Sequence, residues 1–170
     1  MTSERLAGIL ISMRLRHAVV AARIFRHETM PVSFQDIVLA FEFVSSGDVG
    51  GNTAVLCRSS GKIYWRSDFS DLDQMDELPD DAEDDEQYLA IPDKGELDLG
   101  KPLALDFASE HLPDELDEVR SIFSRSGAYR NFRALLIRTK ALERWYAFER
   151  ERTEHALRDW CEENGIELEG

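Results

Sequence analysis

Residues 53–66 read T-A-V-L-C-R-S-S-G-K-I-Y-W-R, two β-branched or aromatic runs on either side of Ser59-Ser60-Gly61. Two such runs joined by a short turn with a glycine predict a β-hairpin, and Gly61 is expected at a left-handed position. Residues 87–92, Q-Y-L-A-I-P, resemble a third strand that pairs most simply antiparallel with the hairpin. The sequence therefore predicts a small three-stranded antiparallel sheet.

Helical patterns precede and follow these strands. Ser33 begins S-F-Q-D, a helix N-cap signature, and the apolar face that follows ends at the glycine-rich residues 45–52. Four further helices are predicted at about 102–111, 114–124, 128–139 and 141–163. Asn164-Gly165-Ile166 is a strong helix stop. We expect one α+β domain over residues 30–170, with the sheet packed against an N-terminal helix and a C-terminal layer of about four helices.

The charge is strongly asymmetric along the chain of 170 residues, which has a net charge of −14. Residues 1–29 carry +3, whereas the rest has 15 basic against 32 acidic residues, or −17. Residues 68–86 alone hold 11 acidic and no basic residues, a composition typical of a solvated, mobile loop. This charge disfavours unspecific nucleic-acid binding and favours a basic protein as partner.

Residues 1–29 are predicted to be a basic extension outside the fold, either a loosely attached helix or translated upstream sequence with Met30 as the working start. Their apolar residues have helical spacing but are interrupted by arginines, and no cleavage site for a secretory signal follows. An organellar presequence is the alternative, because the segment is rich in arginine and poor in acids. No apolar run is long enough for a membrane span, and two cysteines 104 positions apart indicate reduced thiols. We therefore expect a cytoplasmic protein without membrane contact.

Motifs for known chemistry are mostly absent. The glycine-rich residues 45–52 lack the lysine of a phosphate loop, and D-L-D at 71–73 lacks the later ligands of an EF-hand. His155 and Cys161 are six residues apart on one predicted helix, on different faces, so a zinc site is not supported. We expect no cofactor, metal or catalytic site, although a Cys–His nucleophile and a carboxylate-based hydrolase or transferase stay open.

A candidate ligand-binding site lies in the C-terminal third, where ten of the 15 basic residues after Met30 fall between Arg120 and Arg158. Gly127 precedes a predicted helix on which arginines flank an aromatic stripe near the helix start. Free N–H groups and arginines at such a start bind phosphate or carboxylate, and exposed aromatic rings stack on bases. The candidate residues are Gly127, Tyr129, Arg130, Arg133 and Trp145.

Structural alternatives exist for the same residues. Aromatic residues at helical spacing are more often core than a stacking platform, which here concerns Tyr129, Phe132, Trp145, Tyr146 and Trp160. The pairs Glu149–Arg152, Arg150–Glu154 and Glu154–Arg158 are spaced for contacts along one helix. The arginines are also placed to bind the protein's own acidic loop.

The motifs S-S-G-K-I-Y-W, Y-L-A-I-P, S-G-A-Y-R-N-F, R-W-Y-A-F and W-C-E-E-N-G-I resemble the uncharacterised protein family 0158 of bacteria, from about Pro31 to Ile166. The resemblance implies a bacterial, cytoplasmic α+β protein and supplies no activity. The family pattern has a phenylalanine and a second basic residue where this chain has Tyr129 and Asn131, which would weaken an anion site.

Two functional hypotheses follow. The first is a non-catalytic interaction or regulatory protein that binds a basic protein through the acidic loop. The second is an anion-binding module for RNA or a phosphorylated metabolite at residues 127–133. Exposure of the candidate residues around one concavity would favour the second.

Overall fold

The computed structural model describes residues 30–46, 51–67 and 78–169. The predictions for the extension 1–29 and for residues 68–77 of the acidic loop lie outside these ranges. The sheet consists of β1 (Asn52–Cys57), β2 (Ile63–Ser67) and β3 (Tyr88–Ala90), in the order β2-β1-β3 with both pairs antiparallel. Gly61 turns the hairpin with a φ of 69°. The predicted sheet, its third strand and the left-handed glycine are confirmed.

One face of the sheet is covered by α2 (Phe34–Ser46). Because side chains alternate along a strand, Ala54 and Leu56 of β1 enter the core on that face. Phe43 of α2 meets Trp65 of β2 edge-on, at 5.2 Å between ring centres. The N-terminal helix therefore packs on the sheet as predicted.

The start and the end of the described chain lie side by side. Val32 pairs with Leu168 in a parallel bridge, in which the Val32 amide donates to the Glu167 carbonyl at 2.8 Å and the Glu169 amide to the Val32 carbonyl at 2.9 Å. This contact joins residues more than 130 positions apart and has no signal in the sequence.

The C-terminal layer is α3 (Lys101–His111), α4 (Leu116–Ile122), α5 (Ala128–Arg138) and α6 (Leu142–Glu163), with a 3₁₀ turn at Pro113–Glu115. The four predicted helices are thus present within a few residues of their expected bounds, and α6 ends at the predicted stop, where Gly165 has a φ of 68°. Together the sheet and helices confirm the α+β class.

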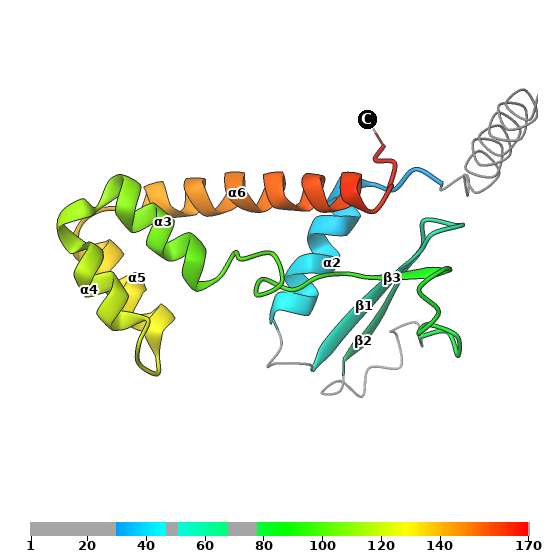
Figure 1. The fold of residues 1–170 in the computed structure, drawn as a ribbon, viewed down its shortest axis with the longest axis horizontal. Coiled ribbons are helices and arrows are strands. Elements are labelled where there is room, and N and C mark those ends of the chain that lie inside the picture. The colour runs from blue at the N-terminus through cyan, green and yellow to red at the C-terminus, as the bar shows by residue number, and fades with distance from the viewer. Residues whose placement is uncertain (1–29, 47–50, 68–77, 170) are drawn as a thin grey trace, which may run out of the picture.

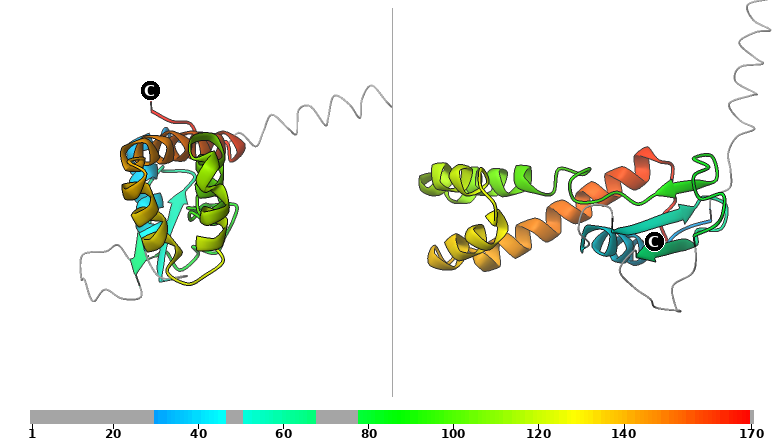
Figure 2. Two further views of the ribbon diagram at one scale, coloured as in Figure 1. Left: turned by 90° about the vertical axis from the view of Figure 1, so that its left-hand side faces the viewer. Right: turned by 90° about the horizontal axis from the view of Figure 1, so that it is seen from below.

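Two groups of elements lie at opposite ends of α6, as Figure 1 and the view from below in Figure 2 show. We call α2 with β1–β3 the sheet unit and α3–α5 the helical unit. Among the described elements, α3 contacts α4, α4 contacts α5, and α3 and α5 contact α6, but none of these three helices contacts α2 or a strand, so the sheet does not pack against them as expected. Helix α6 and the connection 91–100 therefore join the two units.

An aromatic cluster holds the helical unit on α6. Phe107 of α3 is fully buried, and its ring centre lies 5.3 Å from that of Trp145 and 5.4 Å from that of Phe148. Phe132 of α5 contacts Trp145 from another side at 5.1 Å. Rings at these distances and steep angles attract each other edge to face in addition to the area they bury.

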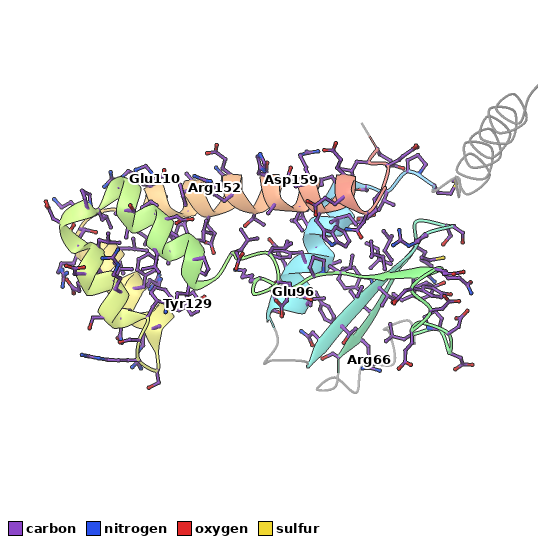
Figure 3. All side chains as sticks on the ribbon, in the orientation of Figure 1. Arg66, Glu96, Glu110, Tyr129, Arg152 and Asp159 are labelled. Atoms are coloured by element: carbon purple, nitrogen blue, oxygen red, sulfur yellow. The ribbon has the colours of Figure 1, made fainter. Side chains whose placement is uncertain are left out.

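The charged residues of α6 connect different elements. Arg152 reaches Glu110 of α3 at 3.1 Å, a pair labelled in Figure 3, and Glu149 pairs with Lys94 of the connection at 3.5 Å. The predicted pairing of Glu149 with Arg152 is wrong, because each side chain has a partner on another element. Exposed pairs of this kind contribute little free energy each, but they orient α6 relative to its neighbours.

Candidate functional site

The start of α5 is a left-handed turn at Gly127, with a φ of 73°. A Cβ atom placed on Gly127 would lie 3.5 Å from Nη2 of Arg130, so the Arg130 guanidinium folds back over the glycine. Gly127 and Arg130 thus lie together at the beginning of the helix. Neither of them lines the hollow between α5 and α6 to which Tyr129, Arg133 and Trp145 contribute.

We predict that Gly127→Ala lowers the free energy of unfolding by about 1 kcal/mol. Space is available for a methyl group, since Arg130 would be at ordinary contact distance. The cost comes from the positive φ, which residues with a Cβ atom rarely adopt. Urea unfolding would measure it, with Gly127→Asn as the control expected to lose less. An alanine variant as stable as the parent would contradict the left-handed turn.

Three of the five candidate residues line one hollow of about 180 Å³ between α5 and α6. Tyr129 and Arg133 come from α5, Trp145 from α6, and Tyr146 and Glu149 complete the polar part of the lining. Trp145 forms a wall and is only 7% exposed, whereas Tyr129 is 60% and Tyr146 44% exposed. The hollow therefore presents two accessible rings and one arginine to solvent.

Tyr129 lies where the helical unit faces the sheet unit (Figure 3). Its hydroxyl would be 3.0 Å from a Cβ atom on Gly100, so it rests against the start of α3. Burial, with a smaller contribution from the charge of Glu149, raises the pKa of Tyr129. A phenol with a pKa at or above its ordinary value keeps its proton at neutral pH and is a hydrogen-bond donor.

The prediction that the aromatic stripe belongs to the core is confirmed for Phe132 and Trp145 and wrong for Tyr129 and Tyr146. Both tyrosines lie at the margin of the buried faces of α5 and α6. A phenol at such a margin can bury part of its ring and keep its hydroxyl in water. Helical spacing alone does not separate these positions from fully buried ones.

A second hollow, of about 590 Å³, lies between α2 and α6. Phe34, Val38 and Phe41 of α2 form its apolar part. It shares Tyr146 and Glu149 with the first hollow, so the two lie next to each other along α6, and we call them together the groove. Sequence reasoning missed this groove because its walls are more than 100 positions apart. Phe34 and Val38 lie on the apolar face of α2 and are only partly buried, because they line this groove.

Arginines along the groove differ in how they are held. Arg158 stacks on the Phe34 ring, with its guanidinium carbon 3.9 Å from the ring centre. Arg130, Arg133 and Arg150 form no ion pair or hydrogen bond within residues 30–46, 51–67 and 78–169. No described residue neutralises these three cations, so they are available to bind an anionic ligand.

The two cysteines occupy different environments. Cys161 is buried in α6, and its burial raises the pKa of the thiol to about 11. Burial also raises the pKa of Cys57, but hydrogen bonds from Ser59 and Ser60 outweigh it and bring the pKa below its ordinary value. His155 is exposed while Cys161 is buried, which confirms that they lie on different faces. Within the described part, no three metal-binding side chains come together.

Charge is separated along α6. Residues 119–144, at its start, hold seven basic and one acidic residue, although the preceding residues 101–118 of the same helical unit hold six acidic residues and one lysine. Residues 78–87 and 159–169 hold 11 acidic and no basic residues. Arg58 places the first of these segments at the end of α6, since its amide donates to the Gln87 carbonyl and its guanidinium to the Asn164 carbonyl. We call these the basic end and the acidic end.

These features define an α+β protein with charges of opposite sign at the two ends of its longest helix and a groove between them. The model of the Uncharacterised protein family (UPF0158) matches residues 30–169, and the chain belongs to that family. The match confirms the resemblance and starts at Met30, after the basic extension. No curated protein and no solved structure matches significantly. In the described residues, no helix has the length and apolar character that crossing a membrane requires.

Proposed function

We propose that this chain is a non-catalytic interaction protein whose acidic end binds a basic partner protein. The supporting observation is the concentration of acidic residues without basic ones in residues 78–87 and 159–169. Most of these carboxylates are exposed, among them Asp80, Glu83 and Asp85. A surface of one sign attracts an oppositely charged partner and accelerates its association.

The acidic end offers a partly ordered surface for such a partner. Residues 79–88 form successive turns, in which the Ala82 amide donates to the Pro79 carbonyl and the Tyr88 amide to the Asp84 carbonyl. The Asp84 carboxylate accepts hydrogen bonds from the Gln87 side chain at 2.9 Å and from the Glu86 amide at 3.0 Å, which lower its pKa. This order of residues 78–86 differs from the mobile loop expected for the whole stretch 68–86. Ordered carboxylates lose less conformational entropy on binding.

The proposal predicts that an affinity pull-down from cell extract recovers a basic protein at low ionic strength and loses it at high ionic strength. Deletion of residues 68–86 should abolish the recovery, and Asp80→Asn/Glu83→Gln/Asp85→Asn should weaken it. The matched control is Asp106→Asn/Asp114→Asn/Glu143→Gln, which removes the same charge from exposed positions away from the acidic end. If the deletion variant retains every partner, the acidic end is not the binding surface.

A second candidate function is anion binding at residues 127–133. It is favoured by Arg130 and Arg133, which lack partners in the described chain, and by the hollow that Arg133 shares with Tyr129 and Trp145. Asn131, one of the two departures from the family pattern, lines a different hollow with Arg138. Titration with inorganic pyrophosphate, followed by tryptophan fluorescence, tests this function by comparing the parent with Arg130→Ala/Arg133→Ala.

A further inference from the structure

We propose that the basic end binds single-stranded nucleic acid, with a base in the hollow between Tyr129 and Tyr146 and phosphates on Arg130 and Arg133. The proposal rests on the second candidate function, anion binding at residues 127–133, and names a polymer as the ligand. Three observations carry it: the unpaired cations, their distance from the acidic end, and the exposed rings.

The cations at the basic end are largely unpaired. Of the seven basic residues in 119–144, Arg120 pairs with Asp117 at 2.9 Å and Arg138 with Glu118 at 2.6 Å. The other five have no ion pair within the described ranges and are exposed: Arg125, Arg130, Arg133, Lys140 and Arg144. Several phosphates of one strand can therefore be neutralised on this surface, whereas a single small anion would use only part of it.

The acidic end is too distant to cancel this charge. Helix α6 has 22 residues and separates the two ends, which corresponds to about 33 Å at the rise of an α-helix. The Debye length at physiological ionic strength is about 8 Å, so the acidic end is screened at the position of α5. The field at the basic end is therefore set by the charges of the helical unit itself, in which five exposed cations of residues 119–144 are unpaired within the described chain and six carboxylates lie in the neighbouring residues 106–118.

The exposed rings favour a single strand over a duplex. Tyr129 and Tyr146 are 60% and 44% exposed, and with Trp145 they line the hollow of about 180 Å³. Bases of a single strand stack on such side chains, whereas those of a duplex are already stacked on one another. These rings would contribute nothing to a surface that bound duplex by charge alone.

Glu149 sets the orientation of the strand in the hollow. Its carboxylate lies in the lining and pairs with Lys94 at 3.5 Å, on the side where the groove continues toward α2. A carboxylate repels phosphate and accepts a hydrogen bond from an amino group on a base edge. The base therefore points toward Glu149, and the backbone runs over the arginines of α5.

Fluorescence anisotropy of labelled oligonucleotides of about 12 nucleotides tests the proposal, since single-strand sites span about 4–16 nucleotides. Parallel arms use single-stranded RNA, single-stranded DNA and a duplex of equal length, and the first two decide which strand is preferred. We expect both single strands to bind more tightly than the duplex. Tyr129→Ala should weaken binding at least about fivefold, whereas Tyr129→Phe, which keeps the ring, should retain it.

The arginines are tested by salt dependence. Arg130→Ala/Arg133→Ala should reduce the slope of log K against log salt by about 1.4, or about 0.7 per phosphate contact. The matched control is Lys62→Ala/Arg66→Ala in the sheet unit, which removes the same charge and should leave the slope unchanged. Circular dichroism establishes that each variant is folded.

Several results would overturn the proposal. These are no binding by the parent, duplex binding as tight as single-strand binding, and equal salt slopes for the parent and the arginine variant. If pyrophosphate binds the parent but not the arginine variant while no oligonucleotide binds, anion binding stands and the nucleic-acid proposal fails. If neither pyrophosphate nor oligonucleotide binds, both fail.

Discussion

Replacing Phe107 by alanine is expected to lower the free energy of unfolding by about 3–5 kcal/mol. Phe107 is fully buried, and its ring contacts those of His111, Trp145 and Phe148. Removing the ring leaves a cavity between α3 and α6 that rigid helices fill only in part. It also removes the edge-to-face contacts that hold the helical unit on α6.

Urea unfolding followed by circular dichroism measures this loss. Tyr129→Ala is the matched control, because it removes a ring of similar size that is 60% exposed and should cost about 1 kcal/mol or less. The two variants therefore compare the loss of a buried ring with the loss of an exposed ring of the candidate site in the same helical unit. A loss below about 1 kcal/mol for Phe107→Ala would contradict the packing of α3 on α6.

Cys57 is expected to react with iodoacetamide at least about 100-fold faster than Cys161 at about pH 8. With a pKa of about 11, the Cys161 thiol is about one part in a thousand thiolate at that pH. The pKa of Cys57 lies below its ordinary value of 9.0, so at least about a tenth of it is thiolate. Burial of Cys161 slows access of the reagent further.

Peptide mapping after timed alkylation gives both rates from one sample. In urea the two thiols should react at similar rates, because unfolding removes the burial that raises the pKa of Cys161 and the hydrogen bonds that lower that of Cys57. Substitution of Ser59 and Ser60 by alanine should slow Cys57 alone. Equal rates in the folded protein would contradict the assigned environments.

Local chemistry predicted the elements well. The hairpin follows from Gly61 between two β-branched or aromatic runs, and the end of α6 follows from Gly165, since both glycines adopt a positive φ. These signals act between residues a few positions apart. They can therefore be recognised in the sequence without knowledge of the fold.

The candidate site was predicted less completely. The sequence pointed to the start of α5, yet it could not tell that Tyr129 is open to solvent while Trp145 is a wall. Both have helical spacing on amphipathic helices, and exposure depends on how α5 and α6 cross. Nor could it pair Glu149 with Lys94 or Arg152 with Glu110, because those contacts join different elements.

The sequence by itself determined the α+β class, the helices and strands with their approximate bounds, and the opposite charges of separate segments. Only the tertiary structure decided that the acidic segments gather at one end of α6, that the arginines lie at the other, and that α2 and α5 flank one groove. The physical reason is the separation along the chain over which each kind of interaction acts. Turn and periodicity signals act over a few residues, whereas Arg58 on Asn164 and Val32 on Leu168 are contacts between residues over 100 positions apart, set by packing.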